Sequence, residues 1–170
     1  MKLFSPDDPR PIHFMGIAGV GMSALALIAK RRGVAVSGCD VSSDGTADLL
    51  QAGVTVAEGH SADHVSDAKA LVYTSAVPTD HPELVAAKVA GIPVVRRAEL
   101  LGQVVNTGKV AALAGTHGKT TTTVMTTVAL SAAGLDPTGI AGGRVAEWNG
   151  NVRLGESDLF VVEADEYDRS

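Results

Sequence analysis

The sequence lacks most features that would indicate an exported, membrane-bound or nucleic-acid-binding protein. A single cysteine, Cys39, excludes an internal disulfide framework and favours a reducing compartment. Aromatic residues make up only 4% of the chain, and no apolar run approaches the roughly 20 residues that span a bilayer. The net charge of −5 argues against a nucleic-acid or anionic-membrane partner. The first residues, 1–11, carry prolines and aspartates instead of a basic-then-apolar export signal. We therefore expect a cytoplasmic protein with small-molecule partners, and the oligomeric state stays open.

Metal-ligand spacing is also missing from the sequence. His60, His64 and His81 lie in segments predicted to be polar loops, and their spacing predicts no metal role. His13 precedes a glycine-rich turn, where we expect a hydrogen-bonded strand histidine. Cys39 is expected to be a small buried residue at the end of a strand.

Glycine and apolar residues are abundant, and their order predicts an α/β fold. The chain is 45% hydrophobic and 19% charged, with 19 glycines among its 170 residues. Short apolar runs alternate with stretches of good helix formers that end at glycine. The predicted strands are 12–15, 34–39, 53–56, 70–73 and 92–95, and the predicted helices are 24–32, 46–52, 82–90 and 97–105. Five such units predict a Rossmann-like domain with a doubly wound parallel sheet over residues 1–105.

A glycine-rich turn, Gly16 to Ser23, follows the first predicted strand. Against the dinucleotide fingerprint G-x-G-x-x-G, Gly16 and Gly21 fit, whereas Ala18 replaces the middle glycine. Asp40 ends the second predicted strand, close to where an acidic residue meets a ribose hydroxyl in that motif. A helix cap or turn role explains Asp40 equally well. The turn therefore indicates a diphosphate site without naming the nucleotide.

A second glycine loop, Gly115 to Thr123, lies between an apolar run, 110–114, and a predicted helix reaching Gly134. Strand, glycine turn, Lys-Thr and helix form the arrangement of a phosphate-binding loop. Lys119 would reach the β- and γ-phosphates of a triphosphate, and the Thr120 hydroxyl would hold Mg²⁺. The general motif has a glycine where this chain has Leu113, so the loop is a shorter variant. The alternative is a Gly-Lys-Thr helix start with ordinary caps.

The rest of the chain predicts an incomplete second domain over residues 106–170. An apolar strand, 158–162, ends in the acidic run Glu163-Ala164-Asp165-Glu166, which would serve a magnesium ion or activate a nucleophile, or form a solvated acidic turn. Residues 137–143 are followed by a polar loop carrying Trp148. One helix and two or three strands would not complete a P-loop sheet, so we expect a truncated domain. The segment Asn151 to Gly155 fits either a surface loop or a substrate contact.

Several of these stretches resemble the Mur ligase superfamily. Its ATP loop has the form GTxGKTT, which Gly115 to Thr121 matches and which accounts for Leu113. His117 within this loop, His13 to Ile17 and Glu163 to Glu166 look most similar to the branch that adds L-alanine to UDP-N-acetylmuramate. Residues 37–40, 75–76, 81–84 and 97–99 also resemble the first domain of that branch. The resemblance covers nearly all of the chain but only the first domain and part of the central domain of a whole ligase.

The resemblance implies two nucleotide sites. The UDP part of UDP-N-acetylmuramate would bind the first domain, with uridine near Asp40 and Ser75. Its diphosphate would lie on the turn residues Gly16, Ala18, Gly19, Val20, Gly21, Met22 and Ser23. ATP would lie on Gly115, Thr116, His117, Gly118, Lys119, Thr120 and Thr121. Mg²⁺ would bind Thr120, with a second metal on Glu163, and the catalytic residues would be Lys119 and His117.

The reaction implied by the resemblance is ATP-dependent amide formation through an acyl phosphate, in the synthesis of peptidoglycan precursors. The muramyl carboxylate would attack the γ-phosphate of ATP, and the amine of L-alanine would then displace phosphate. Three alternatives stay open. One is the sibling ligase that reattaches recycled murein peptide, and another is a nucleotide-binding module without catalysis of its own. The last is an NAD-dependent oxidoreductase, which would leave Lys119 and Glu163 without a role.

Overall fold

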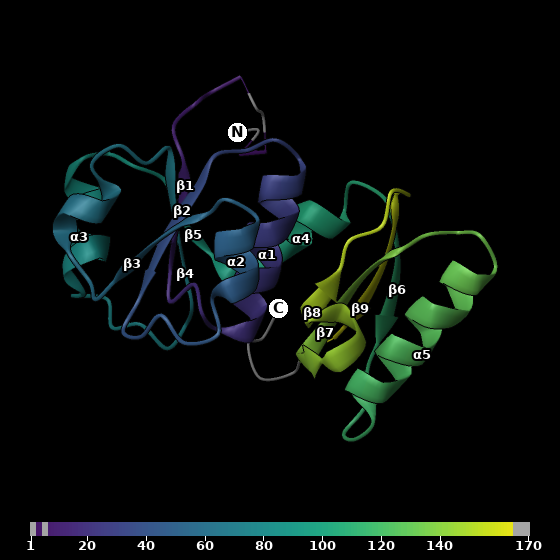
Figure 1. Ribbon diagram of the computed structural model, residues 1–170. Coiled ribbons are helices and arrows are strands. Elements are labelled where there is room, and N and C mark those ends of the chain that lie inside the picture. The colour runs from purple at the N-terminus through teal and green to yellow at the C-terminus, as the bar shows by residue number, and fades with distance from the viewer. Residues whose placement is uncertain (1–2, 5–6, 165–170) are drawn as a thin grey trace. The chain divides into compact units, whose positions relative to one another are not determined.

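The computed structural model describes residues 3–4 and 7–164. Its contacts divide the chain into two compact units, Met1–Leu100 and Leu101–Ser170 (Figure 1). The predicted domain boundary, between residues 1–105 and 106–170, stays a prediction. The division between the units falls inside helix α4 (Arg97–Val105), whereas the predicted boundary falls at the end of that helix. None of the helices in the described ranges is long and apolar enough to cross a membrane.

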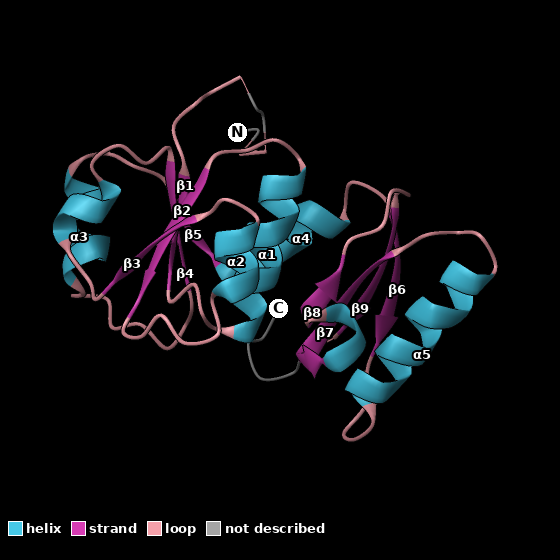
Figure 2. Ribbon diagram, viewed as in Figure 1, coloured by secondary structure: helices cyan, strands magenta, loops and turns pink. Residues whose placement is uncertain are grey.

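The first unit is built on a five-stranded sheet in which every pair of neighbouring strands is parallel. Its strands are β1 (Ile12–Met15), β2 (Val36–Asp40), β3 (Thr55–Glu58), β4 (Ala70–Tyr73) and β5 (Val94–Arg96), in the order β3-β2-β1-β4-β5. The order reverses direction between β1 and β4, so the connections leave the sheet toward opposite faces there. Figure 2 shows the result, with helices α1 and α3 on opposite sides of the sheet. Ligands bind open sheets of this kind at such a reversal, beyond the carboxyl ends of the strands.

Among the described residues, four helices and a 3₁₀ turn accompany the first sheet, and the last of these helices continues past the division between the units. They are α1 (Val20–Arg31), α2 (Ala47–Gln51), η1 (Ala62–Val65), α3 (Pro82–Val89) and α4 (Arg97–Val105). Helix α1 begins at Val20, so the predicted start at Ala24 is wrong. The Ser23 amide already donates to the Gly19 carbonyl at 2.9 Å, because the small residues of the turn let the helix begin at once.

The core of the first unit lies where both faces of the sheet are covered. Ile12 and Phe14 on β1 and Leu71 on β4 have no exposed surface. Burying such a side chain stabilises the fold by about 1.5–3 kcal/mol. On β2, Gly38 allows β1 and the turn that follows it to pack closely against β2, since a Cβ at Gly38 would lie 2.7 Å from the Phe14 carbonyl oxygen.

The described residues of the second unit form four strands, so the prediction of two or three strands and a polar loop is wrong. The strands are β6 (Lys109–Leu113), β7 (Thr138–Val145), β8 (Gly150–Arg153) and β9 (Leu159–Glu163), in the order β6-β9-β7-β8. Strands β6, β9 and β7 are parallel to their neighbours, and β8 runs antiparallel to β7. Helix α5 (Lys119–Ala132) packs on β6, β7 and β9, and η2 (Ala146–Trp148) joins β7 to β8.

Strands β7 and β8 were not predicted, because their sequences lack the apolar pattern that is typical of a strand. Gly139, Gly142 and Gly143 interrupt the apolar pattern of β7. The surface-loop interpretation of the segment that begins at Asn151 is also wrong, since β8 covers residues 150–153 and Asn151 is only 2% exposed. The burial of this polar side chain is not visible in the sequence pattern.

Candidate nucleotide-binding sites

The first glycine turn has a backbone conformation that requires glycine at its first position. Gly16 has a φ of 75°, in the left-handed region that other residues adopt only with strain. The amides of Gly16 and Ile17 both donate to the Cys39 carbonyl, at 2.8 and 3.0 Å. These bonds attach the turn to the end of β2 and fix its position at the carboxyl edge of the sheet.

Helix α1 begins directly on this turn with an uncapped N-terminus. Its N-cap, Gly19, has no side chain to accept the first amides, and the first turn of the helix contains no acidic residue. The first amides of a helix carry a partial positive charge. In α1 the Gly19 amide donates to the Gly16 carbonyl at 3.1 Å and the Met22 amide to the Gly19 carbonyl at 2.9 Å, so the positive end of the helix is not neutralised by a side chain. This end of α1 therefore suits a phosphate, as expected for a diphosphate-binding turn.

Asp40 lies beside the same turn and is held in place by two backbone amides. Its Oδ2 accepts from the Ala18 amide at 2.9 Å, and its Oδ1 accepts from the Val41 amide at 2.8 Å. The role in the turn that the sequence suggested is therefore present. The ribose contact stays a prediction.

A pocket of about 670 Å³ opens over the turn, at the end of β1 and β4. Seven of the residues predicted for the UDP site line it: Gly16, Ala18, Gly19, Val20, Gly21, Met22 and Asp40. Ser23 and Ser75 do not. The hydroxyl of Ser23 donates to the Val20 carbonyl at 3.0 Å, inside the helix, whereas Ser75 lies between the lining residues Thr74 and Ala76.

Arg97 also lines this pocket, and the site prediction from sequence did not include it. Its guanidinium lies close to the turn, because a Cβ added at Gly21 would be 2.9 Å from Arg97 Nη1. Glycine at position 21 thus leaves the space that the guanidinium uses. The position of Arg97 directly after β5, at the carboxyl edge of a parallel sheet, is the signal that could have identified it.

The second glycine loop connects β6 to α5 in the other unit. Gly118 has a φ of 76° and is the N-cap of α5 without a side-chain cap, so this helix also begins with available amides. The ammonium of Lys119 donates to the Gly115 carbonyl at 2.8 Å and so lies folded back over the loop. Thr120 is half-buried, whereas Thr116, His117 and Thr121 are exposed.

Glu163 ends β9 next to the strand that leads into this loop. The register pairs Leu113, the last residue of β6, with Glu163, and the Gly142 amide donates to Glu163 Oε1 at 2.6 Å. The Glu163 carboxylate, fixed at the end of β9 beside the strand that precedes the loop, and the Thr120 hydroxyl are oxygen ligands of the kind Mg²⁺ prefers. The rest of the predicted acidic run, from Asp165, lies outside the described residues.

The sequence comparison supports these observations with a family match. The family model described as "Mur ligase family, catalytic domain" matches residues 11–109, more than half of the chain. The chain belongs to the Mur ligase family. Its match covers the pocket of the first unit, including the glycine turn, Asp40 and Arg97.

Individual Mur ligases that resemble the chain extend well beyond it. UDP-N-acetylmuramate–L-alanine ligase from Myxococcus xanthus is 47% identical over 99% of the chain, but the match covers only 36% of that ligase. The enzyme of the same name from Symbiobacterium thermophilum is 49% identical over 95% of the chain and 34% of its own length. The chain thus spans about a third of the length of the curated relatives it matches.

Solved structures of Mur ligases have the same fold. The UDP-N-acetylmuramate–alanine ligase of Thermotoga maritima superposes with a TM-score of 0.85 and 35% identity, covering 92% of this chain and 37% of the ligase. A murein peptide ligase from Psychrobacter arcticus superposes with a TM-score of 0.83 and 33% identity. This match covers 94% of this chain and 38% of that ligase.

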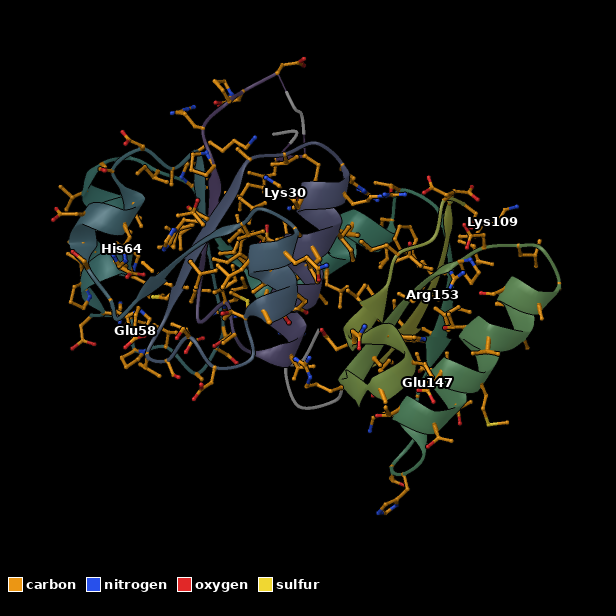
Figure 3. The ribbon with its side chains drawn as sticks, viewed as in Figure 1. Lys30, Glu58, His64, Lys109, Glu147 and Arg153 are labelled. Carbon is orange, nitrogen blue, oxygen red and sulfur yellow. The ribbon has the colours of Figure 1, made fainter. Side chains whose placement is uncertain are left out.

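This Mur ligase chain also contains a buried polar cluster, which the sequence spacing did not predict. His13, Cys39, His64 and Glu83 lie on β1, β2, η1 and α3, and one ligand atom of each lies within 4.8 Å of the others. Figure 3 labels His64, beside α3. The residues are far apart in sequence, so only the parallel sheet and the packing of η1 on α3 bring them together.

The protonation states of the cluster reflect its burial. Burial lowers the pKa of His13 to about 4, so its ring is neutral at neutral pH. Burial, with the nearby Glu83 carboxylate, raises the pKa of the Cys39 thiol. Burial alone would raise the pKa of Glu83, but hydrogen bonds from the Cys39 thiol and the Ser61 amide hold that pKa below its usual value.

Proposed function

We propose that this chain is the nucleotide-binding part of an ATP-dependent ligase that joins UDP-N-acetylmuramate to L-alanine. The observation that carries the proposal is the 47% identity to an alanine-adding ligase across 99% of the chain. The pocket over an uncapped helix start supports it independently, since it offers a diphosphate site. Such a reaction would belong to peptidoglycan precursor synthesis in the cytoplasm.

The first unit would bind the UDP part as a Rossmann-like domain. The diphosphate would lie on the amides at the start of α1, with Arg97 as a further cation. Uridine would lie toward Asp40 and the turn that contains Ser75. In this arrangement Asp40 supports the turn through the Ala18 amide while it faces the pocket.

The second unit would bind ATP as part of a P-loop domain. The amides of the loop residues 115–121 would hold the phosphates, and Lys119 would leave the Gly115 carbonyl to meet them. Thr120 would hold Mg²⁺ and Glu163 a second metal ion, and bound metal would supply neutralisation of the phosphate charge. His117 is exposed on the same loop, where it could contact phosphate or substrate.

The proposed reaction has two steps. A muramyl carboxylate oxygen attacks the γ-phosphorus of ATP, forming an acyl phosphate and releasing ADP. The amine of L-alanine then attacks the acyl carbon, an amide bond forms, and inorganic phosphate leaves with the loss of one amine proton. Both reacting partners of the first step are anions, so charge neutralisation by Lys119 matters more than a strong base.

The alternative within the family is the murein peptide ligase. The fold does not separate the two activities, because TM-scores of 0.85 and 0.83 are nearly equal. The identities of 47–49% to alanine-adding ligases favour the alanine reaction over the recycling reaction. Because the chain spans about a third of those ligases, we propose that it binds nucleotides without completing catalysis by itself.

Isothermal titration calorimetry tests the proposed function directly. UDP-N-acetylmuramate is titrated into the chain, with UDP, NADH and Mg-ATP as comparisons, after circular dichroism has shown that the sample is folded. We expect UDP-N-acetylmuramate to bind and NADH not to bind. The comparison with Mg-ATP shows whether the P-loop unit binds ATP on its own.

Two arginine variants sharpen this measurement. Arg97→Ala removes the guanidinium in the pocket and should weaken UDP-N-acetylmuramate binding about 10- to 100-fold, the usual cost of losing a hydrogen bond to a charged group. Arg96→Ala is the matched control, because Arg96 donates to the Tyr73 hydroxyl at 3.3 Å and does not line the pocket. No binding of UDP-N-acetylmuramate by the folded chain, or binding of NADH in its place, would overturn the proposal.

A further inference from the structure

The buried polar cluster combines residue types that commonly bind transition metals. His13 Nε2, Cys39 Sγ, His64 Nδ1 and a carboxylate oxygen of Glu83 converge from four separate elements of the first unit. Imidazole, thiolate and carboxylate are the three ligand types of protein zinc sites. We propose that these four side chains form a tetrahedral Zn²⁺ site at the edge of the UDP pocket.

Four distances between ligand atoms of the cluster lie close to those of a tetrahedron of zinc ligands, and all of the ligand atoms lie within 4.8 Å of one another. Bond lengths of about 2.0–2.3 Å place tetrahedral ligands about 3.3–3.8 Å apart. His13 Nε2 lies 3.4 Å from Cys39 Sγ, and Cys39 Sγ lies 3.2 Å from Glu83 Oε1. His64 Nδ1 lies 3.2 Å from Glu83 Oε1, and His13 Nε2 lies 3.9 Å from Glu83 Oε2. Zinc binding would draw the wider-spaced ligand atoms closer together through side-chain rotation.

The charges of the cluster also suit a divalent cation. Zn²⁺ with the Cys39 thiolate, the Glu83 carboxylate and two neutral imidazoles forms a site with no net charge. Cys39 and Glu83 have no exposed surface, and His13 is 1% exposed. A neutral site avoids the desolvation cost that an isolated buried carboxylate would carry.

Neighbouring groups orient the ligands as they do in known metal sites. The second ring nitrogen of His13, Nδ1, lies 3.0 Å from the Ser37 hydroxyl, which fixes the ring with Nε2 toward the cluster. The Ser61 amide donates to Glu83 Oε1 at 3.0 Å. Ligating histidines usually have such a partner on the nitrogen that does not bind the metal.

His60 provides the path by which an ion would reach the site. Its side chain is 25% exposed and lines the UDP pocket, while its Nδ1 lies 3.3 Å from Cys39 Sγ and 3.4 Å from Glu83 Oε1. The His64 side chain is 23% exposed. An ion entering from the pocket would thus pass His60 before it reaches the three buried ligands and the partly exposed His64.

The competing explanation is a metal-free hydrogen-bond network, because the same distances suit hydrogen bonds. Cobalt spectroscopy separates the two. Co²⁺ replaces Zn²⁺ in such sites, and a tetrahedral site with a thiolate gives intense visible bands and a near-ultraviolet sulfur-to-cobalt charge-transfer band. The chain, stripped with a chelator and checked for folding by circular dichroism, is titrated with Co²⁺ and then with Zn²⁺.

We expect one Co²⁺ per chain, both spectral features, and their loss when one equivalent of Zn²⁺ displaces the cobalt. Cys39→Ser should abolish the charge-transfer band and weaken Zn²⁺ binding about 100-fold or more, measured by competition with a chromophoric chelator. His64→Ala should weaken binding while leaving the charge-transfer band, since the thiolate remains. His117→Ala, in the other unit, is the matched histidine control and should leave the cobalt spectra and the Zn²⁺ affinity unchanged, whatever its effect on ATP binding.

In the metal titrations, three results would overturn the zinc site. They are no stoichiometric binding by the folded protein, octahedral cobalt spectra without charge transfer, and equal Zn²⁺ affinity in the native and Cys39→Ser chains. Thermal unfolding gives a second measurement, because a metal that binds only the folded state raises the midpoint. The addition of Zn²⁺ should raise the midpoint of the native chain and not that of Cys39→Ser. Equal shifts in both would also contradict the proposal.

Discussion

A single backbone angle at Gly16 governs the shape of the first nucleotide turn. The φ of 75° there lies in the left-handed region, which costs a residue with a Cβ about 1–2 kcal/mol. No atom lies within 4 Å of an added Cβ, so Gly16→Ala tests the angle alone. We expect a loss of about 1–2 kcal/mol in the free energy of unfolding in urea, with weaker UDP-N-acetylmuramate binding.

Gly102 provides the opposite case for comparison. It lies in α4, has no positive φ, and an added Cβ would also meet nothing within 4 Å. Gly102→Ala should therefore stabilise the protein by up to about 1 kcal/mol through helix propensity. A similar effect of the two substitutions would show that the turn does not depend on its left-handed residue.

At the same scale, sequence motifs identified the residues that act through local backbone geometry. Seven predicted residues of the glycine turn and of β2 do line one pocket. Arg97 and the cluster of His13, Cys39, His64 and Glu83 were missed, because each belongs to its site through the fold and not through spacing. No local pattern records which strand ends become neighbours across a parallel sheet.

At the scale of elements, the hairpin of β7 and β8 depends on polar contacts at its base. Arg153 on β8 donates to the Pro137 carbonyl at 2.8 Å and to Asp136 Oδ1 at 2.7 Å. Asp136, with a φ of 40°, also accepts from the Glu156 amide at 2.8 Å. These bonds connect the segment before β7 to both ends of the turn after β8, and they help to form a strand that apolar pattern did not predict.

A double-mutant cycle measures this contact. Arg153→Ala and Asp136→Ala should each destabilise the second unit. Their coupling energy should be about 0.5–1 kcal/mol, because the ion pair is partly exposed, although the Arg153 guanidinium is also held by the Pro137 carbonyl. Urea unfolding followed by Trp148 fluorescence provides the measurement. Arg144→Ala is the control, because that exposed side chain makes its bond to the Asn149 carbonyl instead. A coupling energy of zero would show that Arg153 acts only through Pro137.

Whole elements were predicted correctly where the pattern of apolar residues within the element's own sequence was enough to identify it. The buried strand Ala70–Tyr73 and the helix Arg97–Val105 have the predicted bounds. Strand β8 could not be predicted, because one of its buried side chains is the polar Asn151. The limit is physical: hydrophobic periodicity reports burial only when the buried side chains are apolar.

At the scale of the whole molecule, the chain divides into two compact units, each with its own sheet. The pocket proposed to bind UDP lies within the first unit, and the glycine loop of Gly115 to Thr121 lies within the second. Separate cores allow separate unfolding, since two-state behaviour is a property of single domains. A ligand of one unit should then stabilise that unit more than the other.

This expectation can be measured because Trp148, the single tryptophan of the chain, lies in the second unit. Its fluorescence follows the unfolding of that unit in urea, while hydrogen exchange of β1 and β4 amides follows the first unit. UDP-N-acetylmuramate at about 100 times its dissociation constant should raise the protection of β1 and β4 by about 2.7 kcal/mol. The urea midpoint of Trp148 should stay unchanged. An equal shift in both measurements would show that the two units unfold as one cooperative structure and would refute their independence.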